Sequence, residues 1–421
     1  MGAKSSSLFR LRAKAFSYPN VATSVPDFSS GTVHEIRANQ GINYRLIRPR
    51  IQDNRIVQWL HNQPTPKLGP ASWELTFDTY LHSHGQTLSD STAYDQSTDY
   101  LGFLLAKGLG GETAHATAAN SAIASGAATT GFVVGSGDGA QFLAGQACAV
   151  NPNSLGYYEA REILSRSTDT LTVKVVFSQA PTTSDVVLGG QTTYAPQATP
   201  LTEGVHFVGL GHDANDQVIL ANGCCTGFVL TVKTGQLPTI RWTWRGVGFL
   251  RTTGHTFLGG TFNGAACKVV KNSELLISSI AGTTRVEQHA PDYNYQIALR
   301  RVPWGSPSGQ EGELETVHLG CTVGADITLP FDSTRGAPFT WAYATGGEAG
   351  TRYQWMQQYG RTTPGEIVLL SLPTLDVADE PQKVDLAGLS AVKTMFQGDT
   401  DSAISGGTTD LAKANFRIHR L

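Results

Sequence analysis

The chain has 421 residues, only 15% of them charged, and a formal net charge of −3. That length allows two domains with a core each, but the charge gives no electrostatic basis for wrapping nucleic acid, which needs a basic face. No apolar run approaches membrane-spanning length and the N-terminus lacks the apolar core of a signal peptide, so we expect neither a membrane partner nor a secretory leader.

The composition favours a turn-rich β-protein, because Gly, Thr, Ser and Ala are abundant. Sparse charge also fits a chain that buries surface against copies of itself, since subunit contacts are depleted in unpaired charges. Five cysteines without C-x-x-C spacing support neither a disulfide framework nor a zinc site. They predict reduced, mostly buried thiols and assembly in a cytosol. The cysteines are Cys148, Cys224, Cys225, Cys267 and Cys321.

The first 131 residues are predicted to hold an arm, several strands and one helix. Residues 1–31 form a basic, Ser-rich arm that ends at a Ser-Ser-Gly turn. A helix is expected at Asp99–Gly110, because four apolar residues recur at helical spacing between a capping residue and a glycine cluster. Residues 112–131 are predicted to be a long surface loop or a weak helix. Strands are expected at Thr32–Ile36, Asn43–Arg48 and Trp73–Tyr80.

From residue 131 onward the pattern is almost entirely that of strands. A Gly/Thr-rich stretch at 246–264 is the best boundary between two domains, which we place at 32–250 and 251–421. A short helix is expected around Tyr353–Tyr359. The strands are predicted at Phe132–Val134, Gly156–Ile163, Leu171–Phe177, Val186–Leu188, Gly204–Leu210, Gln217–Ala221, Ala266–Val270, Glu274–Ile280, Tyr293–Arg301, Glu366–Leu372, Gly388–Gln397 and Asn415–His419.

A strand-pair pattern occurs twice in the sequence, about a hundred residues apart. The first copy runs from Gly223-Cys224 through Phe228–Lys233 and a turn to Thr239–Arg245. The second runs from Gly320-Cys321 through Ala325–Leu329 and a turn to Pro338–Tyr343. In both copies apolar residues alternate, as in half-buried strands. This repetition predicts duplicated β-domains, which are typical of assembly components rather than of single-site enzymes.

Alternation divides the strand Thr239–Arg245 into two faces. Trp242 and Trp244 share the face of Ile240. Sugar stacking is one role for paired tryptophans, but this shared face favours the core. Arg241, Thr243 and Arg245 face the other way and are candidates for a subunit contact or an aqueous lumen.

Three other motifs are weak candidates for chemistry. Gly135-Ser-Gly137-Asp-Gly139 lacks the following helix that a dinucleotide loop needs, so a glycine turn between strands is favoured. His82-Ser-His84 has no third ligand nearby, which favours a solvated loop end over a metal site. The carboxylate pairs Glu159/Glu162 and Asp213/Asp216 are expected in solvated turns rather than across a glycosidase cleft. We therefore expect no catalytic, cofactor-binding or metal-binding residue.

Four segments follow one another along most of the chain. They are the strand Trp73–Tyr80 with the helix Asp99–Gly110, the paired strands within Gly156–Val173, the hairpin Gly223–Gly246, and the closing strands Gly365–Pro373 and Lys383–Val392. Taken in this order, they resemble the major tail tube proteins of long-tailed bacteriophages, in the larger branch with two tube-like halves. The resemblance covers most of the chain in patches, and the order of the patches gives it weight. The segment at 112–131 and the basic arm depart from what a compact tube subunit would show.

The resemblance implies a mainly β chain of two tandem β-sandwich or partial-barrel domains with one or two short helices. The inner sheets of neighbours would join into a cylinder of six tube domains, so three chains would complete a pseudo-sixfold ring. Stacked rings would form the tail tube of the virion, assembled in the host cytoplasm. Tail tip or baseplate proteins and the tail terminator would be partners. Double-stranded DNA would pass a neutral to acidic lumen without specific binding. The chain is not expected to be an enzyme.

Ring-to-ring contacts are expected from the N-terminal arm and the loop Ser83–Asp95, because mobile exposed segments can order on stacking. His82 and His84 join the arginine face as candidate ring or lumen contacts.

Two other functions stay open. One is a distal tail or baseplate ring protein of the same fold, which would stop at one layer where a tube subunit polymerises. The other, less favoured, is a polysaccharide-acting β-enzyme, which would need a cleft with opposed carboxylates and aromatic platforms.

Overall fold

The chain is mainly β with two α-helices in the part that the structure describes, as the sequence predicts. Neither of these helices is long and apolar enough to cross a membrane. The computed structural model describes residues 7–8, 10–17, 26–28, 31–39, 41–48, 50–51, 67–68, 72–84, 98–114, 120–189, 192–197, 201–210, 217–252, 273–280, 286–288, 292–305, 313–345, 352–386, 388–399, 411 and 414–421.

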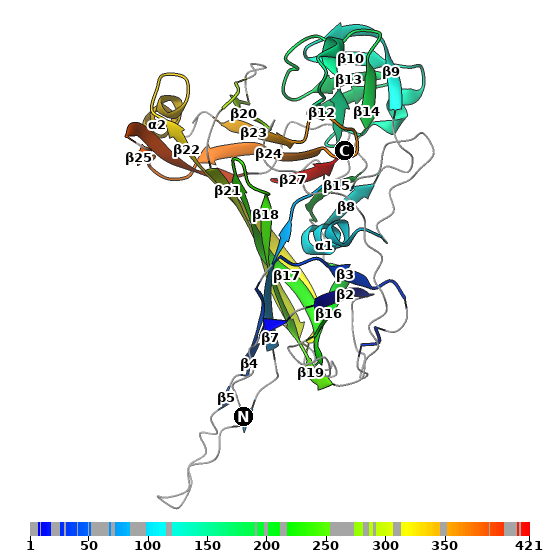
Figure 1. Cartoon of the computed structure of the whole chain (residues 1–421), viewed down its shortest axis with the longest axis vertical. Helices are drawn as coiled ribbons and strands as arrows, with labels where there is room; N and C mark the ends of the chain where they lie inside the picture. Colours follow the sequence, from blue (N-terminus) through cyan, green and yellow to red (C-terminus); the bar gives the residue numbers. More distant parts are fainter. Residues whose placement is uncertain are drawn as a thin grey trace, which may run out of the picture.

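The strands form one large sheet, a closed barrel and a two-stranded ribbon (Figure 1). The large sheet contains β1 (Ser7–Leu8), β2 (Arg10–Ser17), β3 (His34–Ile36), β4 (Ile42–Ile47), β7 (Ser72–Tyr80), β8 (Gly110–Ala114), β15 (Thr192–Pro196), β16 (Glu203–Leu210), β17 (Gln217–Lys233), β18 (Thr239–Val247), β19 (Phe249–Thr252), β20 (Glu274–Ser279), β21 (Asp292–Gly305), β22 (Glu313–Pro330), β23 (Tyr353–Tyr359), β24 (Val368–Val377), β25 (Gln382–Leu386), β26 (Leu389–Gly398) and β27 (Arg417–Arg420). The barrel contains β9 (Asn120–Ala128), β10 (Gly131–Val134), β11 (Ala147–Val150), β12 (Glu159–Ser167), β13 (Thr170–Val173) and β14 (Val186–Gly189). The ribbon is β5 (Arg50–Ile51) with β6 (Lys67–Leu68), and the helices are α1 (Tyr100–Leu109), α2 (Gly336–Thr345) and the 3₁₀ turns η2 (Asp138–Gln141) and η3 (Pro152–Ser154).

One strand arrangement occurs twice in the large sheet. In the first repeat, residues 10–252, β2 pairs with β3 and β16, and the hairpin β4–β7 leads into α1. Strand β16 then pairs with β17, β17 with β18 and β18 with β7, while β19 returns to the beginning of β17.

The second repeat, residues 274–420, reproduces each of these pairings. Strand β20 pairs with β23, and Leu276 of β20 also forms a single β-bridge with Glu287. The hairpin β21–β22 leads into α2. Strand β23 then pairs with β24, β24 with β26 and β26 with β22, while β27 returns to the beginning of β24. Such agreement in connectivity is the mark of an internal duplication.

The two repeats lie side by side in one sheet. Strand β17 of the first repeat pairs with β21 of the second, which gives the order β4-β7-β18-β17-β21-β22-β26 with β25 beyond β26. These long strands cross the middle of the molecule (Figure 1). The expected boundary at residue 251 falls in β19, at the end of the first repeat.

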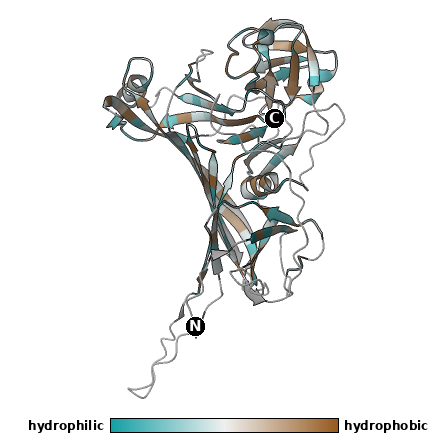
Figure 2. Cartoon of the chain, in the orientation of Figure 1, coloured by the Kyte–Doolittle hydropathy of each residue, from teal (hydrophilic) through white to brown (hydrophobic). Residues whose placement is uncertain are grey.

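A six-stranded barrel, residues 120–189, is inserted into the first repeat. The strands on either side of it, β8 and β15, pair with each other, so the insertion leaves the large sheet continuous. The barrel has its own core, which includes Ile123, Phe132, Phe142 and Ile163. The barrel strands carry both hydrophobic and hydrophilic residues (Figure 2). The sequence predicts these residues as part of one domain at 32–250 rather than as a separate unit.

The main core confirms the predicted orientation of the tryptophan face. Trp242 and Trp244 are fully buried with Trp73 in one cluster. A Cβ at Gly223 or Gly246 would lie 2.6 Å from the Trp73 ring, so only glycine leaves room for that indole between the strands.

Helix α1 confirms the predicted helix, with Asp99 at its N-cap and the left-handed Gly110 at its C-cap. Two other segments differ from prediction. Pro338–Tyr343 is part of α2 rather than a strand, because β26 occupies the place beside β22. Of its alternating aromatic residues only Phe339 is buried, whereas Trp341 is 68% exposed. Tyr353–Tyr359 is the strand β23 rather than a helix, since it lies between β20 and β24 and is buried on both faces.

The expected arm and the expected loop are also partly wrong. Residues 10–17 of the arm form β2, which lies between β16 and β3, and Arg12 is buried beside Glu35. Much of 112–131 is strand, in β8 and β9, because both strands find partners far away in the sequence. The predicted strand Ala266–Val270 lies outside the described residues.

Candidate assembly surface

The long central strands of the large sheet have a solvent-facing side, which we call the polar face. Its residues alternate with core residues along seven neighbouring strands, as a strand period of two requires. They are Asn43, Arg45, Glu74, Thr76, Asp78, Val229, Thr231, Arg241, Thr243, Arg245, Asn294, Gln296, Thr322, Asp326, Lys393, Met395 and Gln397. The predicted contact residues Arg241, Thr243 and Arg245 are among them, with both arginines exposed.

Cross-strand ion pairs run along this face. Glu74 lies opposite both Arg45 and Arg245 in register, and its carboxylate is 2.7 Å from the Arg245 guanidinium and 3.9 Å from that of Arg45. Arg241 donates two hydrogen bonds, of 2.9 and 3.0 Å, to the two carboxylate oxygens of Asp78. These hydrogen bonds and the Asp78 charge raise the pKa of Arg241. Direct opposition of unlike charges is a stabilising arrangement in antiparallel sheets.

Replacing Arg241 by alanine is expected to change the unfolding free energy of the monomer by less than about 1 kcal/mol, because exposed ion pairs contribute little. Its neighbour Trp242 is the matched contrast, since the buried indole makes Trp242→Ala cost about 3–5 kcal/mol. Urea unfolding below the concentration of any assembly measures both changes. Equal losses would mean that the polar face is not solvated in the monomer.

The second repeat continues the polar face with fewer charges. Asn294 donates a hydrogen bond of 3.3 Å to Asp326, and the Lys393 ammonium lies 3.8 Å from the same carboxylate. The outward side chains Lys233 and Arg300 add positive charge. Among the named residues of the polar face, positive side chains therefore outnumber negative ones.

His82 and His84 are buried, so the expectation of a solvated loop end is wrong for both. The two ring nitrogens of His82 lie 2.8 Å from the Ser83 carbonyl oxygen and 3.1 Å from the Tyr100 hydroxyl. Burial, and then the Arg420 charge, lowers the pKa of His82 to about 4, so the ring is neutral near pH 7. Neither histidine lies on the surface of the described chain. The rest of the loop Ser83–Asp95, from residue 85, lies outside the described residues.

The glycine segment Gly135–Gly139 is a turn between strands, as predicted. The backbone N–H groups of Gly137 and Gly139 donate hydrogen bonds of 3.0–3.1 Å to the Asp169 carboxylate. An acidic side chain of the chain itself thus takes the position that a phosphate would take in a nucleotide loop.

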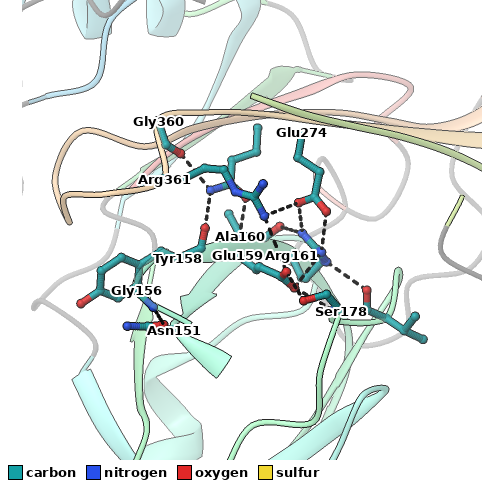
Figure 3. Close-up of polar contacts among 12 residues, drawn as sticks. Asn151, Gly156, Tyr158, Glu159, Ala160, Arg161, Ser178, Glu274, Gly360 and Arg361 are labelled. Carbon is teal, nitrogen blue, oxygen red and sulfur yellow. Dashed lines mark hydrogen bonds and ion pairs between the residues drawn. The ribbon is translucent and has the colours of Figure 1, made fainter. Parts of the chain in front are cut away.

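Glu159 and Glu162 are fully buried, so the prediction of solvated turns is wrong for this pair. Arg161 lies between Glu159 and Glu274, with donor–acceptor distances of 2.9–3.2 Å, and the Arg361 guanidinium lies within 4 Å of both carboxylates (Figure 3). Glu159 also accepts a hydrogen bond of 2.8 Å from the Ser178 backbone N–H. The network joins strand β12 of the barrel to the second repeat.

Glu162 belongs to a second buried network at the same junction. Its carboxylate is 2.7 Å from Arg417, 3.1 Å from Lys174 and 3.7 Å from the His419 ring. Burial alone would raise the pKa of Glu162, but the Arg417 and Lys174 charges outweigh burial and hold that pKa well below its usual range. Local sequence gives no signal for these networks, because partners such as Glu162 and Arg417 are 255 residues apart. Asp213 and Asp216 lie outside the described residues.

Apolar contacts surround the two networks. Ala149 and Ala160 of the barrel pack in one cluster with Leu276, Met356 and Leu369 of the second repeat. The barrel is inserted in the first repeat yet packs on the second, so it fixes the two repeats relative to each other.

A small cavity of about 200 Å³ lies at the end of α1. Lys107 and Glu203 in its wall form an ion pair, and burial raises the pKa of Glu112. Among the described residues no other titratable side chain lines it, and the wall also contains Ala106, Gly110, Gln197, Leu201 and Thr202.

None of the four described cysteines forms a disulfide, and Cys267 lies outside the described residues. Burial raises the pKa of Cys148, Cys225 and Cys321 to about 12, which leaves these thiols unreactive. No cluster of His, Cys, Asp and Glu within the described ranges could hold a metal ion. No protein-family profile matches the sequence, and no curated protein matches it.

Proposed function

We propose that the chain is a structural subunit that joins copies of itself edge to edge into rings, which stack as the tail tube of a bacteriophage virion. The observation that carries this proposal is the repeated strand arrangement, in which the second repeat continues the sheet of the first through β17 and β21. This contact is head-to-tail, because a late strand of one repeat pairs with the first hairpin strand of the next.

A head-to-tail contact can recur between chains. Strand β4 at one edge is the counterpart of β21, and β25 at the other edge continues the counterpart of β17. Each chain therefore ends where the next could begin, and heterologous contacts of this kind form rings when the rotation between copies closes. Closure would also cover the outer edges of β4 and β25 over their whole length, and natural sheets avoid leaving such edges open.

Six repeats around an axis would need three chains, which gives a ring with pseudo-sixfold symmetry. The tail tip or baseplate and the tail terminator would be the partners at the two ends of the stack. Double-stranded DNA would pass without specific binding, a role that needs no catalytic residue.

The same geometry fits a distal tail or baseplate ring, and only stacking separates the two roles. A polysaccharide-acting enzyme has less support. The carboxylates Glu159 and Glu162 are paired with buried cations, and Trp242 and Trp244 lie in the core rather than on a platform.

Negative-stain electron microscopy of the purified protein over a range of concentrations tests the proposal. Hollow filaments of uniform bore built from three-chain rings are expected. Lone rings would favour a terminal ring protein, and a ring of six chains would contradict the trimeric arrangement. Monomers at every concentration would reopen the enzyme hypothesis, to be followed by a glycan screen.

A further inference from the structure

The duplication lets the two repeats be aligned residue by residue. Trp244 of β18 and Phe396 of β26 are each followed two residues later by a glycine, Gly246 and Gly398. A Cβ at either glycine would contact a side chain of the facing strand, β7 or β22. These two aromatic residues are therefore equivalent, and they fix the alignment.

The alignment matches the first hairpin strands, β4 and β21. In the first repeat, Leu75 of β7 lies between Trp244 of β18 and Tyr44 of β4. In the second repeat, Ala325 of β22 lies in the same way between Phe396 of β26 and Tyr295 of β21. Tyr44 and Tyr295 are therefore equivalent. The matched segments share an Asn-Tyr pair that was not used to align them. They are Ile42-Asn43-Tyr44-Arg45 and Tyr293-Asn294-Tyr295-Gln296.

The same alignment matches β25 to the end of β17. Thr231 of β17 faces Thr239, which lies five residues before Trp244. Val384 of β25 faces Ala391, which lies five residues before Phe396. Val384 is thus the counterpart of Thr231.

The contact between β17 and β21 then defines a register between chains. Within one chain Thr231 faces Asn294 across an antiparallel pair. By equivalence Val384 of one copy would face Asn43 of a second copy, and Gln382 would face Arg45. Parity is preserved, because the pairing of Gln382 with Lys393 puts it on the polar face with Arg45.

Charge is complementary at the end of this register. Asp379 and Glu380, just before β25, are exposed, and the alignment places them beside Ile47 and Arg48 at the end of β4. Arg48 is exposed as well. Opposite charges thus meet where the two edges run past one another.

The edge of β4 already carries a short strand at the same place. In β1, Ser7 faces Asn43 and Leu8 faces Ile42, antiparallel to β4. Val384 and Asp385 of a second copy would need these same two positions. Strand β1 therefore pairs with β4 at the positions equivalent to those at which β17 pairs with β21.

We propose that β4 docks β25 of a second copy in this register, and that β1 occupies the edge until the second copy displaces it. This docking rests on the proposed function. It adds the strand register of the contact between chains and the way in which β1 regulates that contact. Displacement is favourable because β1 pairs at two of the described residues, whereas the equivalent contact of β17 runs over seven, from Gly227 to Lys233. A temporary strand also shields an edge that could otherwise pair indiscriminately.

A reversible disulfide tests the displacement. Directly opposed strand residues are close enough for a disulfide, so Ser7→Cys with Asn43→Cys should lock β1 onto β4 after oxidation. We expect the oxidised variant to stay monomeric and the reduced variant to assemble like the wild type. Removal of residues 1–8 should lower the critical concentration for assembly by about tenfold. Ser7→Cys alone, oxidised in the same way, is the control.

Charge reversal tests the register. Arg48→Glu should raise the critical concentration at least tenfold, and so should Asp379→Lys with Glu380→Lys. All three changes in one chain should restore assembly, which a merely structural role for these residues would not do. Arg166→Glu, at an exposed position of the barrel, is the matched control and should assemble normally.

The outcomes separate the inference from the proposed function. Rings that form equally well with the disulfide closed would overturn the displacement, and failure of the triple variant to recover would overturn the register. The proposed function would survive both results. If neither the wild type nor the truncated chain forms rings at any concentration, the proposed function and the inference are both wrong.

Discussion

Replacing Arg161 by alanine is expected to lower the free energy of unfolding by about 3–5 kcal/mol, because two buried carboxylates would lose their hydrogen-bonded cation and keep the more distant Arg361. Arg161 is 1% exposed and lies between Glu159 and Glu274, which are also buried. Since Glu159 belongs to the barrel and Glu274 to the second repeat, the loss should also free the barrel from the main sheet. Chemical denaturation of the monomer measures the first effect, and limited proteolysis that releases the barrel measures the second.

Arg166→Ala is the matched control for this experiment. Arg166 lies on the same strand but is exposed, and it donates one hydrogen bond to the Gly139 carbonyl. Its loss should cost no more than about 1 kcal/mol. Adding Glu159→Gln and Glu274→Gln to Arg161→Ala should recover part of the stability, because the unpaired charges disappear. If that triple variant were less stable than Arg161→Ala alone, unpaired charge would not be the source of the loss.

Acidification from pH 7 to pH 4 is expected to destabilise the monomer by several kcal/mol, owing to two buried neutral histidines. Burial, and then the Arg420 charge, lowers the pKa of His82 to about 4, and burial, then the Lys14 charge, does the same for His206. As the pH falls through 6.5 the unfolded chain takes up these protons first, so stability is lost between about 6.5 and 4. A difference of about 2.5 pKa units corresponds to about 3 kcal/mol for each histidine.

Unfolding free energies at a series of pH values test this expectation. His206 accepts a hydrogen bond of 3.0 Å from the Asn222 backbone N–H, and glutamine can supply an acceptor in its place. His206→Gln should therefore remove about half of the loss between pH 6.5 and 4. A variant curve parallel to that of the wild type would show that His206 is not the titrating group.

Carboxylates add a second phase below pH 4. Burial alone would raise the pKa of Asp99, but Arg420 lowers it to about 2. The stability that this ion pair contributes is complete above the unfolded value of 3.8 and is lost as the pH falls to about 2.

Local pattern was sufficient for several predictions. The strand Trp73–Tyr80, the helix after Asp99, the core position of Trp242 and the outward position of Arg241 each depend on a period or a cap within a few residues. A repeat of two residues predicts which side chains share a face of a strand. The structure agrees with that prediction wherever one face is buried and the other is solvated.

Prediction failed where distant partners decide the outcome. Tyr353–Tyr359 is buried on both faces, so it carries no alternation that could distinguish a strand from a helix. Glu162 is buried because Lys174 and Arg417 converge on it from other elements. The second copy of the strand-pair pattern was wrong beyond β22, although the duplication itself exists in the order of the strands.

The sequence by itself determined the fold class, the faces of the half-buried strands and the ends of α1, because these follow from interactions within one element. The tertiary structure alone decided which strands are neighbours, that residues 120–189 close into a separate barrel, and which charges are buried. Hydrogen bonding between strands is nearly the same for any pair of sequences, so pairing is selected by packing over the whole sheet, which no short window of sequence contains.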